Sequence, residues 1–133
     1  MATKEQLFTI ITPEEGANIS GGKAYELVIK RLYCVKAGAD ILGDDETKLL
    51  VNGSKLWGAD MGAGSNKEFD PLLRVSVDNG EFVGLYDGDG IWSRDDSMGG
   101  FTINGLQEAT TINLSGSGSQ YTLTYKVIES SIF

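Results

Sequence analysis

The sequence predicts an all-β protein, an antiparallel β-sandwich of about eight strands. Three observations indicate this fold. Short apolar runs recur along the whole chain. Each run ends at Gly, Asn, Asp, Ser or Pro, the residues that favour turns. No segment sustains the spacing of three and four positions that an amphipathic helix requires. The 133 residues fit one domain, 1–133, and 18 Gly with only 2 Pro favour many tight turns over disorder.

The first half of the chain contains three expected strands. These are 6-QLFTIIT-12, 24-AYELVIKRLYCV-35 and 46-ETKLLVN-52, which are rich in the β-branched and aromatic residues that favour strands. The following stretch, 57-WGADMGAGSNKEFD-70, has no such pattern. We expect it to form an irregular surface loop.

Two further strands are expected on either side of a turn. The runs 71-PLLRVSVD-78 and 81-EFVGLYD-87 are joined by 78-DNGE-81. Asn-Gly readily takes the positive φ values of a type I′ turn, so this segment is expected to be a hairpin turn.

Three strands are expected in the last third of the chain, at 100-GFTING-105, 108-EATTINL-114 and 120-QYTLTYKVI-128. The last run alternates large apolar residues with their neighbours, as a strand with one buried face does. The Gly- and Ser-rich segment 114-LSGSGSQ-120 is expected to be a flexible connection.

Several classes of site and location are disfavoured by composition. The chain has no His, which excludes His-based triads and imidazole metal sites. Cys34 is its single cysteine, which excludes an internal disulfide, and its side chain is expected to be buried. It starts without a signal-peptide pattern, and no stretch approaches the roughly 20 apolar residues that cross a bilayer. We therefore expect a protein that is not transmembrane. The expected location is the cytoplasm, in solution or peripheral to a membrane, with signal-independent export as the alternative.

The negative charge is concentrated in two short segments. The formal net charge is −8, and eight of the 19 acidic residues lie within 40–46 and 87–96. Without these eight, the acidic residues equal the 11 Lys and Arg. An overall charge this negative disfavours nucleic acid as a partner.

The two acidic segments predict a calcium site. Loops of a β-sandwich collect at its two ends, so we expect the acidic loops to lie clustered at one end. Asp87 and Asp89 are two positions apart at the end of an expected strand, which puts both carboxylates on one side. Ca²⁺ takes about 6–8 oxygen ligands and tolerates irregular geometry, whereas Mg²⁺ usually keeps several waters. An EF-hand is excluded, because its Gly would fall on Trp92. The candidate ligands are Asp40, Asp44, Asp45, Asp87, Asp89, Asp95 and Asp96.

This pattern resembles the calcium-dependent membrane-targeting C2 domains of synaptotagmins and protein kinases C. The third loop of those β-sandwiches typically reads Asp-x-Asp, five residues, then an Asp followed shortly by a Gly. Here 85-LYDGDGIWSRDDSMGG-100 supplies Asp87, Asp89 and Asp95, with Asp96 at the usual distance from a Gly. Their first loop carries two Asp, which Asp40 and Asp45 match. The resemblance covers residues 24–104 and implies a Ca²⁺-dependent docking module of C2-like fold.

The chain also departs from the family pattern. The spacing in the first loop is one residue shorter than usual, and the following strand opens with Asp45-Glu46-Thr47 where Asp-Pro-Tyr is common. A Lys-rich strand is not evident, because Lys48 and Lys55 stand nearly alone.

Apolar residues lie inside both acidic segments, namely Ile41, Leu42, Ile91 and Trp92. In the C2 domains that this sequence resembles, such loop tips enter the bilayer interface after Ca²⁺ neutralises the carboxylates, and Trp favours that interface. The interpretation is therefore a non-enzymatic calcium-binding module that docks on an anionic membrane or a protein. Three alternatives remain open: a Ca²⁺-dependent carbohydrate-binding module or lectin in which Trp92 or Trp57 stacks on a sugar, a structural assembly domain, and acids that serve only as a solvated surface.

Overall fold

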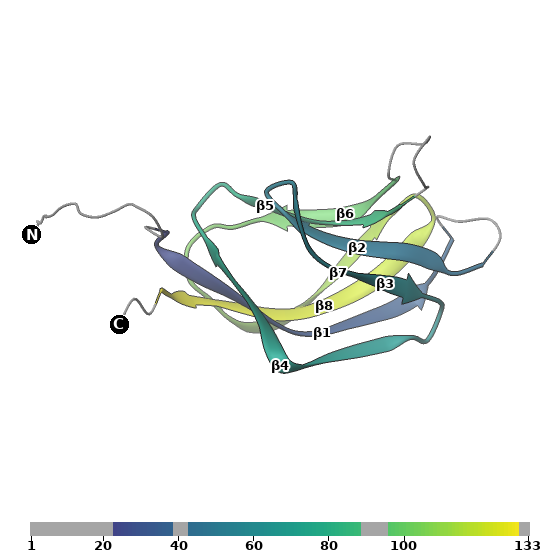
Figure 1. Ribbon diagram of the computed structural model, residues 1–133, viewed down its shortest axis with the longest axis horizontal. Coiled ribbons are helices and arrows are strands. Elements are labelled where there is room, and N and C mark those ends of the chain that lie inside the picture. The colour runs from purple at the N-terminus through teal and green to yellow at the C-terminus, as the bar shows by residue number, and fades with distance from the viewer. Residues whose placement is uncertain (1–22, 39–42, 89–95, 131–133) are drawn as a thin grey trace, which may run out of the picture.

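Two antiparallel β-sheets of four strands each pack face to face in the computed structural model, which describes residues 23–38, 43–88 and 96–130 (Figure 1). The first sheet has the strand order β4-β1-β8-β7, and the second has the order β3-β2-β5-β6. The predicted antiparallel sandwich of about eight strands is confirmed. The strands are β1 (Tyr25–Lys36), β2 (Asp45–Val51), β3 (Ser54–Met61), β4 (Asn66–Val77), β5 (Phe82–Asp87), β6 (Asp96–Thr102), β7 (Gln107–Gly116) and β8 (Ser119–Glu129).

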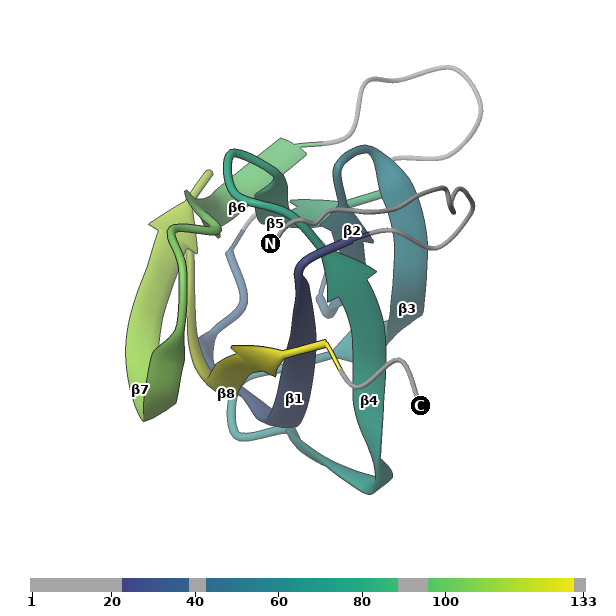
Figure 2. The same ribbon diagram turned by 90° about the vertical axis from the view of Figure 1, so that its left-hand side faces the viewer.

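The core lies between the two layers, which Figure 2 shows edge-on. β8 follows the predicted alternation, because Tyr121, Leu123, Tyr125 and Val127 are buried at every second position. In β1 the alternation shifts at a bulge after Ile29, where the register with both neighbouring strands changes. This bulge lets a long strand keep apolar side chains toward the core on both sides of the irregularity.

Two tight hairpins connect neighbouring strands. Asn52 and Gly53 both have positive φ, at 51° and 86°, and join β2 to β3. Ser117 and Gly118 have φ of 53° and 85° and join β7 to β8. Positive φ at both central residues is the signature of a type I′ turn. The expectation of a flexible connection at 114–120 is therefore wrong, because most of that segment belongs to two paired strands.

Two further expectations are corrected by the topology. Residues 57–70 are not an irregular loop, since most of them belong to β3 and β4. Both strands lie at sheet edges, and within 57–70 only Met61 and Phe69 are buried, so this stretch lacks a regular apolar pattern. The turn at 78–81 does not form a hairpin either, because β4 and β5 belong to different sheets. Of its two central residues, only Gly80 has positive φ. The expected strand at 6–12 lies outside the described residues.

The strand ends that border the acidic segments lie at one end of the sandwich. Figure 1 shows that β1 and β5 run toward this end, while β2 and β6 start from it. Residue pairing agrees, because Thr47 of β2 lies opposite Asp87 of β5, and Asp87 lies opposite Asp96 of β6. We call this the acidic end. The described chain begins and ends at the opposite end, where the Ser130 amide donates to the Ala24 carbonyl.

Candidate functional site

Three of the predicted ligands begin or end strands of the second sheet. Asp45 is the first residue of β2, Asp87 is the last of β5, and Asp96 is the first of β6. These strands are neighbours in the order β2-β5-β6. The fold therefore brings the strand ends that border both acidic segments to one sheet and one end, which places 45 and 87 close together despite their separation in sequence.

The carboxylates of Asp45 and Asp87 occupy core positions. Asp45 is in phase with Thr47 and Leu49 on the buried face of β2, and Asp87 is in phase with Leu85 on that of β5. Both aspartates have exposed fractions of 0%. Burying an ionised carboxylate is costly unless hydrogen bonds or a cation compensate. Two such groups at one end of a core need a physical explanation.

Asp45 receives hydrogen bonds from two hydroxyls of β8. Ser119 Oγ and the Tyr121 phenol both donate to Asp45 Oδ2, each at 2.8 Å. Because the phenol has only one proton, Thr47 Oγ1 then donates to the Tyr121 oxygen, at 2.7 Å. The other carboxylate oxygen, Asp45 Oδ1, is buried and has no hydrogen-bond partner. Neutral donors thus stabilise one oxygen and leave the other able to accept.

Asp87 contacts the backbone next to Asp45. The Glu46 amide donates to Asp87 Oδ1 at 2.7 Å, and the Gly88 amide donates to the Glu46 carbonyl at 2.9 Å. These two bonds lock the end of β5 against the start of β2. The Asp87 carboxylate is therefore held beside the residue that follows Asp45.

Asp44 and Asp96 are less enclosed. Asp44 is exposed, and its carboxylate lies against Gly62 of the β3–β4 connection, where an added Cβ would be 2.3 Å from Asp44 Oδ1. Asp96 is partly buried and lies opposite Asp87 in the β5–β6 register. Cross-strand partners project to the same side of a sheet, and like charges in such positions repel. A cation near Asp87 would relieve this repulsion.

The remaining predicted site residues cannot be placed. Asp40, Asp89 and Asp95 lie outside the described residues, as do the apolar positions Ile41, Leu42, Ile91 and Trp92. Within residues 23–38, 43–88 and 96–130, no group of three or more His, Cys, Asp or Glu side chains could hold a metal ion. The described part of the chain thus contributes Asp45 and Asp87 as buried acids, and a complete calcium shell stays a prediction.

Ser119 links the two stems of the first acidic segment. The Gly38 amide donates to Ser119 Oγ at 3.0 Å, and Ser119 donates in turn to Asp45 Oδ2. The backbones also touch, since an added Cβ at residue 38 would lie 2.4 Å from the Gly118 carbonyl oxygen. Glycine is therefore required at 38. Sequence reasoning missed this contact, because nothing local marks a Ser in a Gly-Ser run as a partner of an Asp 74 residues away.

Cys34 and Tyr121 complete the buried polar cluster. Cys34 is fully buried, as expected, and burial raises the pKa of its thiol, so it is protonated at neutral pH. Burial is also the main cause of the raised pKa of Tyr121, and the neighbouring Asp45 contributes. Tyr121 therefore keeps its proton and donates it to Asp45.

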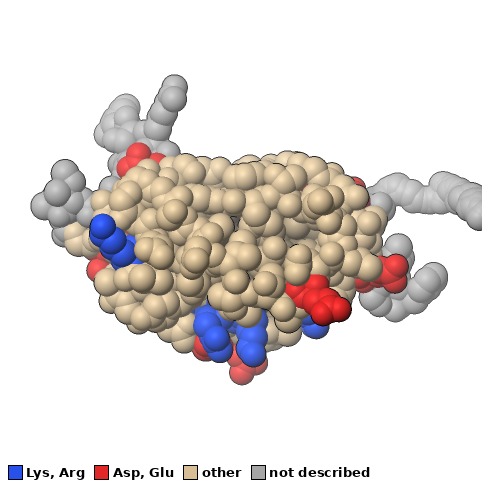
Figure 3. All heavy atoms as spheres, turned by 180° about the vertical axis from the view of Figure 1, so that it is seen from behind, with Lys and Arg blue, Asp and Glu red and all other residues tan. Residues whose placement is uncertain are grey.

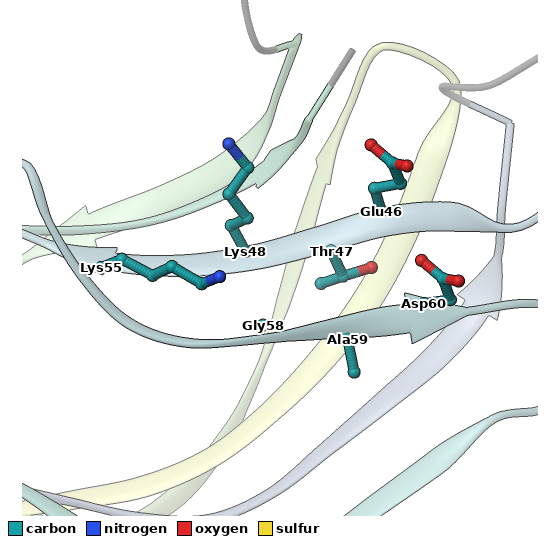
Figure 4. A pocket seen from close by; sticks show the side chains of 7 residues that line it. All are labelled: Glu46, Thr47, Lys48, Lys55, Gly58, Ala59 and Asp60. Atoms are coloured by element: carbon teal, nitrogen blue, oxygen red, sulfur yellow. The ribbon is translucent and has the colours of Figure 1, made fainter. Parts of the chain in front are cut away.

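A shallow hollow of about 280 Å³ lies on the outer face of β2 and β3 (Figure 4). Lys48 and Lys55, which looked isolated in the sequence, both line it. Glu46 and Asp60 line the same hollow and lie opposite each other in the β2–β3 register. Two cations and two anions balance, so this hollow is not a basic patch.

Comparisons with known proteins found similarity to C2 domains in solved structures. No family model and no curated protein matches the chain. The C2A domain of plant extended synaptotagmin 1 matches 84% of this chain and 96% of its own, with 13% identity and a TM-score of 0.48. A structure described as a C2 domain matches 80% and 98%, with 14% identity and a TM-score of 0.47. These matches agree with the resemblance seen in the sequence. At identities this low, the similarity concerns only the arrangement of the strands and does not identify a ligand.

The described residues contain no helix that is long and apolar enough to cross a membrane.

Proposed function

We propose that this chain is a non-enzymatic calcium-binding β-sandwich module that docks on an anionic membrane or a protein partner when Ca²⁺ is bound. The ion would lie between segments 40–46 and 87–96. The observation that supports this proposal is the state of Asp45, a fully buried carboxylate with one oxygen that accepts no hydrogen bond.

A cation explains Asp45 better than a purely structural role does. Ser119 and Tyr121 donate to Oδ2, but a buried acceptor left unsatisfied costs about 1–3 kcal/mol, and more when it is charged. A structural acid would gain from a donor to Oδ1 as well. A bound metal would use that oxygen and at the same time offset the charge of Asp87.

The donor chemistry of the acidic end suits Ca²⁺. Every side chain predicted for the site offers carboxylate oxygen, the ligand that hard divalent cations prefer. Asp45 and Asp87 come from different strands and sit at fixed positions, so they would hold the ion from two sides. The bound ion would supply positive charge at the acidic end and would lower the repulsion between the two segments.

The docking step rests on the apolar residues of the same segments. Without a cation, Ile41, Leu42, Ile91 and Trp92 belong to segments with strong negative charge, which an anionic surface repels. With Ca²⁺ bound, that repulsion falls and the apolar side chains can enter the interface, where Trp is favoured. Calcium would therefore act as a switch for docking.

Titration calorimetry with Ca²⁺ on chelator-treated protein tests the proposal. We expect saturable binding to the wild-type chain and to Asp60→Asn, a matched acid on β3 outside the site. Asp45→Asn should bind at least tenfold more weakly. The absence of binding to the wild-type chain, or equal binding by Asp45→Asn, would contradict the proposed site.

A further inference from the structure

Charged residues are unevenly distributed over the fold. Between Ser97 and Tyr125 the only charged residue is Glu108, although 23% of the whole chain is charged. Figure 3 shows the consequence, a broad face with few Lys, Arg, Asp or Glu side chains. Strands β7 and β8 contribute Thr, Ser, Asn and Gln in their place. This part of the surface presents neutral hydrogen-bonding groups.

Two complete rows of polar side chains cross the outer face of the first sheet. Both follow from the strand pairing. One row runs from β4 to β7 through Asn66, Tyr33, Thr122 and Asn113. The next runs through Glu68, Arg31, Thr124 and Thr111. Neighbouring strands lie about 4.8 Å apart, so each row extends over roughly 14 Å.

Several of these side chains are held in place by one another. Glu68 Oε2 accepts from Arg31 Nε and from Asn66 Nδ2, the latter at 3.0 Å. These bonds lower the pKa of the Glu68 carboxyl, so it is ionised and balances Arg31. The hydroxyls of Thr111 and Thr124 form a hydrogen bond of 2.8 Å. A ligand would therefore meet groups that are partly ordered before it binds, which lowers the entropic cost of binding.

Tyr33 stands among these groups with 37% of its surface exposed. Its ring lines a shallow hollow of about 450 Å³ together with six other residues of the two rows, Arg31, Asn66, Glu68, Thr111, Thr122 and Thr124. An exposed aromatic ring offers a flat apolar surface, and its phenol adds a polar group. Hydroxyl, carboxamide, carboxylate and guanidinium groups surround that ring.

We propose that this hollow is a binding site for a neutral oligosaccharide. A sugar ring would stack its C–H face on Tyr33, while its hydroxyls would exchange hydrogen bonds with Asn66, the threonines and the Arg31–Glu68 pair. The length of the rows accommodates more than one sugar ring. This site lies on the outer face of the first sheet, away from the buried acids, and does not depend on calcium.

The charges of the hollow argue against other ligands. Its one cation, Arg31, is already paired with Glu68, so no free positive charge is left for a phosphate or a nucleic acid. An anionic membrane would find neither a basic cluster nor an apolar patch there. A neutral polyhydroxylated ligand matches a neutral polar face in a chain whose net charge is −8.

Affinity electrophoresis of the full chain in gels that contain neutral glucans, mannans, galactans or xylans tests this site, in calcium and in chelator. We expect retardation by at least one polysaccharide in both conditions, and at least tenfold weaker binding by Tyr33→Ala. Phe82→Ala is the matched control, because Phe82 is a similarly exposed aromatic residue, at 41%, on the other sheet. Thr122→Val is a second variant in the hollow, and circular dichroism would verify that all variants are folded.

Three outcomes would overturn the proposal: no binding to any of these polysaccharides, equal binding by wild-type chain and Tyr33→Ala, or binding that chelator abolishes. The third would place the sugar at the acidic end instead. Calcium binding by calorimetry is measured separately, so failure of the sugar site and failure of the calcium site are distinguishable.

Discussion

Tyr121 on β8 donates its phenol proton to Asp45 on β2, at 2.8 Å, and this hydrogen bond joins the two sheets at the acidic end. Both residues have an exposed fraction of 0%. Thr47 donates to the same phenol, so Tyr121 fixes two neighbouring inward-facing residues of β2. The orientation of a predicted calcium ligand therefore depends on a residue of the opposite layer.

Tyr121→Phe should destabilise the fold. The substitution keeps the ring but removes the donor to Asp45 and the acceptor for Thr47, which leaves buried polar groups unsatisfied. The expected loss in the free energy of unfolding is about 1–3 kcal/mol, measured by urea denaturation in chelator. Tyr125→Phe is the control, because no hydrogen bond of its hydroxyl is found in the described structure. Equal losses in both variants would show that the contact with Asp45 contributes little.

Ser119→Ala should weaken calcium binding and remove the link between Gly38 and Asp45. Ser119 bonds both Gly38 and Asp45, which flank residues 39–44. Without the hydroxyl, the Gly38 amide should exchange its hydrogen faster, measured by hydrogen exchange in chelator. Ser117→Ala is the control from the same turn, because its hydroxyl bonds the Ser97 carbonyl instead. If Gly38 exchange is unchanged while calcium affinity falls, Ser119 acts on Asp45 alone.

Asp45→Asn should reduce the stabilisation by calcium. A ligand that binds only the folded state stabilises it by about 2.7 kcal/mol at a hundredfold excess over its dissociation constant. The wild-type melting temperature should therefore rise with Ca²⁺, while that of Asp45→Asn should rise clearly less at the same Ca²⁺ concentration, as read by differential scanning fluorimetry. Asp78→Asn, at the opposite end, should respond like wild type. Equal wild-type melting curves in calcium and chelator would remove the calcium hypothesis.

Stability should fall at alkaline pH through Tyr121. Its pKa is raised in the folded state, mainly by burial, above the ordinary value of 10.0. The folded state therefore holds this proton more tightly than the unfolded state does. The contribution of the protonated phenol to the free energy of unfolding is complete below pH 10 and is lost as pH rises beyond that. Cys34, whose pKa is also raised from 9.0, acts in the same direction at slightly lower pH. Unfolding of Tyr121→Phe and wild type followed between pH 8 and 11 should show a smaller decline in the variant.

Local pattern predicted the strands that have one clearly buried face. Residues 120–128 alternate because every second side chain of β8 enters the core, and the acids at 45 and 87 mark the ends of β2 and β5. β3 and the first part of β4, residues 66–70, were missed, since an exposed edge imposes no alternation, whereas the expected strand at 71–78 matches the rest of β4. Asn52-Gly53 was also missed, although this dipeptide is a strong signal for a hairpin.

The buried partners of Asp45 could not be predicted. Ser119 and Tyr121 lie 74 and 76 residues from it in sequence, and only the packing of one sheet on the other brings them together. A hydroxyl residue on an alternating strand looks the same in sequence whether it contacts water or a buried carboxylate. Long-range polar contacts of this kind depend on the topology of the whole sandwich.

Trp92 should report the docking step. The chain has two Trp, and Trp57 packs edge-to-face on Phe69 with ring centroids 5.3 Å apart. Because Trp57 belongs to the body of the sandwich, Trp57→Phe leaves Trp92 as the sole tryptophan while preserving an aromatic contact. In that background, emission should shift to the blue with anionic liposomes only when Ca²⁺ is present, since bound calcium would lower the repulsion between the acidic segments and the surface. Neutral liposomes are the control for the charge dependence.

Trp92→Ala in the wild-type chain should remove most liposome binding and leave calcium affinity in solution near normal. Emission that is already blue-shifted and protected from quenchers in the free protein would place Trp92 in the core, and a protein partner would then replace the membrane in the proposed function.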